Sequence, residues 1–363
     1  MPRFRQPLAC VAALLVARLA TAADTAPSPL AAEAERWLAA SRQAPAGNPD
    51  LAGPRRDAER MLERSQADLA AGRSWLAFEE LARGRGLLRA LALGDENPAA
   101  RTDMAAFERL WRERGAALIA EERALRATPW GDTPGAVRAI AESAQGKIAT
   151  LVEASRAYAA VTSPGDGLFY LGQAQAAAEL ARLARTVAPS PAAGKPSGAL
   201  VLRSILPELR ELQAKVTAAF QPPRSIELHS DFIRLNATLK LAQELEAAEL
   251  YAGAVYQYLD AVQQLAALAA PAASSAAAEP AAWKQRLAGR GDTTLGELFL
   301  QRAEAMRAAP AAAQKPGDAR AVQLIAEHVL PAYVAILDRG GSVAPTAEKA
   351  ASVTVTLVRW PYT

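Results

Sequence analysis

The chain has 363 residues, of which 51% are hydrophobic and 22% charged, and its formal net charge is +3. The hydrophobic excess is alanine and leucine, which favours helices over strands, so we expect an all-α fold. Three arginines and no acidic residue lie within the first 23 residues, so the remaining chain carries 38 basic and 38 acidic side chains. Because the remaining chain has no net positive charge, its composition gives no indication of a nucleic-acid partner.

Residues 1–23 have the pattern of a secretory signal peptide. Arg3 and Arg5 precede an apolar run from Leu8 to Val16, and small residues follow around Ala22. The run is too short for a permanent anchor, so we predict a periplasmic or secreted protein without a transmembrane segment in its mature chain. The single cysteine, Cys10, lies in this segment, so the mature chain has no disulfide, thiol nucleophile or thiolate metal site.

The next segments predict a helix followed by a group of three. Within residues 24–53, an N-terminal capping helix is expected over 29–44. Residues 54–133 form the first round: a helix from Pro54 that ends near Gly72, a second that begins at Ser74 with that residue as its N-cap, and a third over 99–127.

The same order recurs twice, over 134–222 and 223–315. The second round is predicted as helices over 134–161, 165–185 and 199–220, and residues 316–340 supply one terminal helix. The prolines that open the four segments stand 80, 89 and 93 residues apart, each directly before a helix, where proline is well tolerated. The order predicts a degenerate helical-repeat array; the alternative is an irregular bundle, with about ten to twelve helices in either case.

The tail, residues 341–363, has a different pattern. Val353, Val355 and Leu357 alternate with threonines, which predicts an extended or strand-like segment. Its end carries Arg359, Trp360 and Tyr362. Such a tail could add a strand to a partner's sheet, or fold back over the last helix.

Two stretches resemble the tetratricopeptide repeats. Large and small residues follow the order of that family's helix pair in the third round, and a shorter match occurs in the first round: Leu241, Ala242, Leu245, Tyr251, Ala254, Tyr258 and Ala261, then Ala77, Leu81 and Gly84. The rounds are longer than that family's period of about 34 residues. The resemblance implies a helical scaffold that binds proteins or peptides and has no catalytic activity.

Aromatic residues begin the second helix of each round, and they are our candidate binding residues together with the three tail residues. They are Trp75, Phe78, Phe169, Tyr170, Tyr256 and Tyr258. Large rigid side chains of this kind are typical of binding surfaces. The same spacing also suits a core seam in which aromatic rings pack against alanine.

No motif predicts a catalytic, metal or cofactor site. His328 shares an apolar helical stripe with Ile325 and is expected in the core. His229 lies between Glu227 and Asp231, which could form an acid/base or weak metal site, or simply favour a helix N-terminus.

These observations predict an exported, non-enzymatic helical scaffold that binds a protein or peptide in the cell envelope. Two alternatives remain open. One is a periplasmic or secreted hydrolase that acts on polysaccharide or cell wall through carboxylates. The other is a carrier of small apolar ligands with a cavity between its helices.

Overall fold

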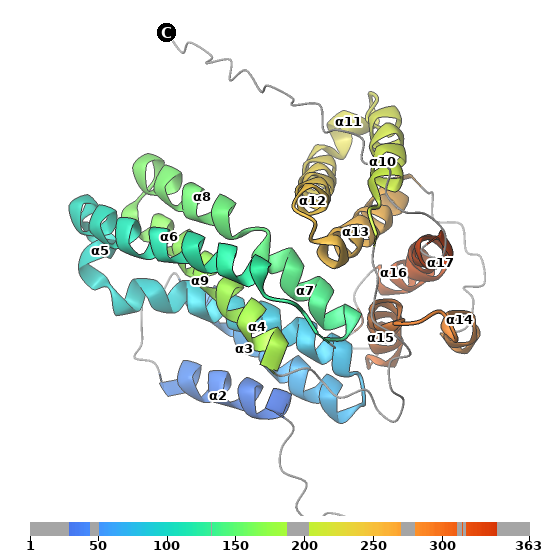
Figure 1. Ribbon diagram of the computed structural model, residues 1–363, viewed down its shortest axis with the longest axis horizontal. Coiled ribbons are helices and arrows are strands. Elements are labelled where there is room, and N and C mark those ends of the chain that lie inside the picture. The colour runs from blue at the N-terminus through green and yellow to red at the C-terminus, as the bar shows by residue number, and fades with distance from the viewer. Residues whose placement is uncertain are drawn as a thin grey trace, which may run out of the picture.

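The computed structural model describes residues 29–43, 51–131, 133–186, 203–269, 280–310, 314 and 317–339. Every regular element among these residues is a helix, as an all-α fold requires (Figure 1). Residues 1–23, predicted as a signal peptide, and the tail over 341–363 lie outside the described ranges.

The N-terminal helices follow the predicted boundaries closely. They are α2 (Pro29–Gln43), α3 (Ala52–Ala70) and α4 (Ser74–Glu96). Helix α3 ends at Ala70, and Gly72 follows two residues later with a φ of +76°, a conformation that favours glycine after a helix. A Cβ at Gly84 of α4 would lie 2.9 Å from the Ala58 carbonyl oxygen, so a glycine permits the close packing of α3 on α4.

The predicted helix over 99–127 is two helices, α5 (Pro98–Thr102) and α6 (Met104–Ala127). Asp103 between them is extended, with φ −109° and ψ 118°, and its carboxylate accepts hydrogen bonds from the amides of Ala105 and Ala106. An aspartate N-cap therefore starts a new helix inside the apolar pattern.

The predicted helix over 134–161 is also divided, into α7 (Gly135–Gln145) and α8 (Ile148–Val161). The break falls at Gly146 and Lys147, where a Cβ on the glycine would lie 2.4 Å from Leu245 Cδ2. Helix α9 (Pro164–Thr186) then matches the prediction over 165–185 and packs along both α8 and α4.

The second half of the chain contains α10 (Leu206–Ala219), α11 (Arg224–Glu227), α12 (His229–Ala247), α13 (Tyr251–Ala269), α14 (Pro280–Leu287) and α15 (Thr294–Ala308). The predicted helix that opens at Pro223 is interrupted at Leu228, after the single turn of α11. Because several predicted helices are divided, the described residues hold more helices than the ten to twelve expected.

The terminal helix consists of α16 (Asp318–Leu324), a π-helical turn η2 (Ile325–Val329) and α17 (Leu330–Arg339). The prediction that His328 lies in the core is wrong, because the wider π turn shifts the helical register and leaves this side chain exposed. By length and composition, Asp318–Arg339 could cross a membrane; its buried residues include Val329, Leu330 and Tyr333, and a core helix passes the same test.

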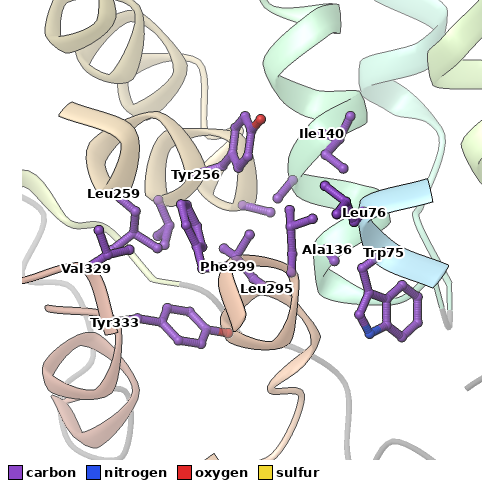
Figure 2. Close-up of a cluster of buried hydrophobic side chains, with 14 of the residues drawn as sticks. Trp75, Leu76, Ala136, Ile140, Tyr256, Leu259, Leu295, Phe299, Val329 and Tyr333 are labelled. Carbon is purple, nitrogen blue, oxygen red and sulfur yellow. The ribbon is translucent and has the colours of Figure 1, made fainter. Parts of the chain in front are cut away.

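The first half of the chain, α2 to α9, lies beside the second half, α10 to α17 (Figure 1). Helix α7 is at the junction and packs against α4, α9, α13 and α15. Figure 2 shows the buried side chains that meet there, including Trp75 and Leu76 of α4, Ile140 of α7, Leu259 of α13 and Phe299 of α15.

Two helices at this junction are capped by side chains from a distant part of the chain. The side-chain oxygen of Gln301 accepts hydrogen bonds from the amides of Trp75 (3.0 Å) and Leu76 (3.1 Å) at the start of α4. Asp292 accepts from the Gly135 amide at 2.6 Å at the start of α7. The prediction that Ser74 is the N-cap of α4 is wrong, because Ser74 is the first helical residue and Arg73 occupies the N-cap position without a side-chain capping bond.

Candidate functional site

An ion-pair cluster joins α4, α13 and α15 inside the protein. Arg302 donates from Nε to Glu79 Oε2 at 2.8 Å and from Nη1 to Asp260 Oδ1 at 2.9 Å. Glu79 also accepts from the Tyr256 hydroxyl at 2.5 Å and from Arg83 at 2.7 Å. One buried carboxylate therefore connects three helices.

The electrostatics of Glu79 indicate a structural role. Burial alone would raise the pKa of Glu79, but the charges of Arg302 and Arg83 and hydrogen bonds from Arg302 and Tyr256 outweigh burial and lower it to about 2. Burial and the neighbouring Glu79 carboxylate raise the pKa of Tyr256 far above its usual value. At neutral pH the carboxylate is ionised and the phenol is neutral, so neither is poised to transfer a proton.

A cavity of about 350 Å³ lies over this cluster, between α3, α4 and α15. Its charged lining is made of paired groups: Arg64 with Glu80 at 2.9 Å, Arg73 with Asp68 at 2.7 Å, and the Glu79 cluster. Each carboxylate in this lining is held by an arginine. The cavity therefore lacks the pair of free, facing carboxylates that a glycoside hydrolase needs.

Three of the predicted binding aromatics belong to the core. Trp75 is 4% exposed and Phe78 is fully buried, and Trp75 Nε1 donates to Glu297 at 2.9 Å. Tyr256 is buried against the ion-pair cluster, whereas Tyr258 is half-buried beside the same core. Trp75, Phe78 and Tyr256 therefore pack in the core, which is the second of the two interpretations of the aromatic pattern, and do not form a binding surface.

The aromatic pair on α9 lies at the surface. Leu168 and Leu171 fill the core, while Phe169 and Tyr170 are half-buried. Tyr170 stacks on Tyr158 of α8, with ring centroids 4.3 Å apart, and meets Phe169 edge to face at 6.0 Å.

Tyr158 is 44% exposed, and Val161 at the end of the same helix is 82% exposed. We call Tyr158, Val161, Phe169 and Tyr170 the α8–α9 aromatic surface. A second group of exposed apolar side chains, Phe220, Ile226 and Ile233, lies around α10, α11 and α12. Among the described residues, Met104 at the start of α6 and Leu206 at the start of α10 are also exposed.

The remaining candidates give no site within the described residues. His229 is exposed, Glu227 ends α11, and Asp231 pairs with Arg234 at 3.2 Å. No group of three metal-ligating side chains occurs in the described part of the chain. Arg359, Trp360 and Tyr362 lie outside the described residues.

Sequence reasoning missed a second cavity, of about 480 Å³, between α2, α4 and the C-terminal half of α9. Its lining is dominated by arginine and glutamate: Glu33, Arg36, Trp37, Arg85, Arg89, Glu179, Arg182, Leu183 and Thr186. The only signal in the sequence is the spacing of charged residues on single helices, such as Arg85 and Arg89. Their main partner, Glu179, lies 94 residues beyond Arg85, so no local pattern in the sequence predicts this ion pair.

Comparison with known proteins yields no match: no protein-family model, no curated protein and no solved structure is significantly similar to this chain.

Proposed function

We propose that this chain is an exported, non-enzymatic helical scaffold that binds a protein or peptide partner in the cell envelope. The observation that carries the proposal is the α8–α9 aromatic surface. Stacked tyrosines beside a strongly exposed valine are the composition that protein interfaces favour, because aromatic rings give large contact areas at low entropic cost.

The tyrosines of this surface are suited to a partially polar partner. The side-chain hydrogen bond with Tyr158, together with partial burial, raises the pKa of Tyr170, so the Tyr170 phenol is neutral at physiological pH. Each ring offers an apolar face, and the hydroxyl groups can exchange hydrogen bonds with a partner's backbone.

The helix arrangement supports a scaffold of repeated helix pairs. Helices α3 and α4, α8 and α9, and α12 and α13 each pack against one another along the chain, one pair in each predicted round. Helix hairpins that stack in series form extended surfaces for partners, which is the use implied by the resemblance to tetratricopeptide repeats.

The interior of the described residues supports binding rather than hydrolysis or apolar transport. Glu79, the most buried carboxylate at the 350 Å³ cavity, is locked in ion pairs. Both cavities have linings of paired charges, which suit neither a carboxylate hydrolase nor a carrier of apolar molecules.

The test is affinity capture from an envelope extract of the source cells, using the purified protein and a Tyr158→Ala/Val161→Asp variant. Both substitutions are at exposed positions, so the fold should be retained. We expect one protein to be captured by the wild type and lost with the variant, because an aspartate in the surface must be desolvated on binding.

Two further arms make the outcome specific. An Ile226→Ser/Ile233→Ser variant, which changes the other exposed apolar group, should capture the partner as well as the wild type does. A chain that ends at Ala351 measures the contribution of Arg359, Trp360 and Tyr362. The proposal fails if no protein is retained, if both double variants lose the partner equally, or if the purified chain alone hydrolyses cell-wall polysaccharide.

A further inference from the structure

The 480 Å³ cavity is lined by more arginines than glutamates. Four arginines and two glutamates line it, and two of the arginines also pair with glutamates beside the lining: Arg89 with Glu96 at 2.5 Å and Arg182 with Glu121 at 2.8 Å. Arg85 and Arg89 form its inner wall and are 8% and 15% exposed, while Arg36 and Arg182 form an open rim at 66% and 59%. The cavity volume suits a small polar ligand.

The glutamates of the lining already accept several hydrogen bonds. Glu33 accepts from Arg36 at 2.7 Å and from Trp37 Nε1 at 2.9 Å through one oxygen. Glu179 accepts from Arg85 at 2.8 Å and from Gln175 at 3.1 Å. The four arginines therefore all have glutamate partners in or beside the lining, and what remains unmet is hydrogen-bonding capacity on Arg85.

Arg85 is the group that points to a ligand. Its residue is 7% exposed, its Nη2 is bonded to Glu179, and its guanidinium lies 5.4 Å from the centre of the Trp37 ring. Its buried Nη1 has no hydrogen-bond partner, and its Nε only approaches Glu33 at 3.4 Å. A buried donor without an acceptor costs about 1–3 kcal/mol, and a bound anion or water removes that cost.

The surroundings of Arg85 favour an anion over water. Burial lowers the pKa of Arg85, and the like charges of Arg36 and Arg182 oppose the effect of Glu179 and Glu33. The guanidinium stays protonated, so additional negative charge is the change that stabilises it. The fixed fork of an arginine also matches two oxygens of one oxyanion.

We propose that this cavity binds a compact oxyanion, a phosphate or carboxylate group of a small ligand, with Arg85 and Arg89 as the inner donors and Arg36 and Arg182 at the rim. The site is distinct from the α8–α9 aromatic surface and does not depend on it. Tyr170 and Arg182 are both on α9, and at the rise of a helix their backbones are about 18 Å apart.

The experiment is isothermal titration calorimetry of the purified protein with inorganic phosphate and, separately, with succinate. We expect saturable binding of at least one of the two at a single site. The Arg36→Ala/Arg182→Ala variant removes only exposed rim charges and should weaken that binding by about tenfold or more. Binding of phosphate alone assigns the site to tetrahedral oxyanions, and binding of succinate alone assigns it to carboxylates.

The matched control is Arg42→Ala/Arg156→Ala. These arginines are 61% and 59% exposed, take part in similar surface ion pairs and lie outside the cavity lining. Their removal changes the net charge equally and should alter the affinity by less than about twofold, because screened charges outside the site contribute little. The proposal is overturned if neither anion binds at millimolar concentration, or if the control weakens binding as much as the rim variant does.

Discussion

Glu79 shows how a single residue can be both costly and stabilising. Burying an ionised carboxylate that is only 1% exposed has a large desolvation penalty, which only close and well-oriented partners can offset. Arg302 donates to both of its oxygens, and Arg83 and Tyr256 supply the remaining hydrogen bonds. Because these partners come from α4, α13 and α15, the charge links the two halves of the chain.

The substitution Glu79→Gln should lower the free energy of unfolding by about 3–5 kcal/mol at pH 7, because it leaves Arg302 buried without its main counter-charge. The folded-state pKa of Glu79 is about 2, below its ordinary value of 4.5, so this stabilisation is present above pH 4.5. It should be lost as the pH falls from 4.5 towards 2. Urea unfolding of both proteins across this pH range measures the difference.

Glu63→Gln is the control for that measurement. Glu63 pairs with Arg42 at 2.9 Å, but its side chain is 52% exposed, so the change should cost less than about 1 kcal/mol at any pH. An unfolding free energy of the Glu79 variant within about 1 kcal/mol of the wild-type value at pH 7 would contradict the structural role of the cluster.

The starts of several helices are set by contacts between elements. Ser74 follows the sequence rule for an N-cap, yet the free amides at the start of α4 donate to Gln301 of α15. The start of α7 depends similarly on Asp292, in the loop before α15. The hydrogen bonds that cap α4 and α7 therefore also hold α15 and the loop before it against these two helices.

Two substitutions at the start of α4 test whether Ser74 or the distant Gln301 caps this helix. Gln301→Ala should destabilise the protein by about 1–2 kcal/mol, because two buried amides lose their acceptor. Ser74→Ala should change the stability by less than about 0.5 kcal/mol, because Ser74 is not at the N-cap position and Gln301 accepts from the amides of Trp75 and Leu76. Thermal and urea unfolding measure both; a larger loss for Ser74→Ala than for Gln301→Ala would refute the distant cap.

The sequence predicts elements better than it predicts their interruptions. Apolar periodicity and glycine place α2, α4 and α9 within a few residues of their observed limits. The breaks at Asp103, Gly146 and Leu228 and the π turn at His328 have weak local signals. At Gly146, packing against Leu245 accompanies the break, and no periodicity reports that distant contact. The arginine cavity was missed for the same reason, since α2, α4 and α9 meet only in the folded chain.

At the scale of the whole molecule, two clusters of buried side chains form the core. The larger one includes Phe78 and Phe299, and the smaller one, between α6, α8 and α9, includes Phe107. Helices α4 and α9 contribute to both: Leu93 and Leu171 lie in the smaller cluster, whereas Phe78 and Leu180 lie in the larger. A Cβ at Gly172 of α9 would lie 2.7 Å from Ala90 Cα, so these shared helices are in close backbone contact.

Because α4 and α9 belong to both clusters, we expect neither cluster to unfold while the other keeps its packing. Phe107→Ala and Phe299→Ala each empty a fully buried site, and each should lower the stability of the whole described fold by about 3–5 kcal/mol. We expect a single unfolding transition in both variants, with far-UV circular dichroism and the hydrogen exchange of α6 and α15 amides changing together. If Phe107→Ala exposes the amides of α6 and α8 while those of α13 and α15 stay protected, the clusters are separate folding units, and α4 and α9 connect them without coupling them.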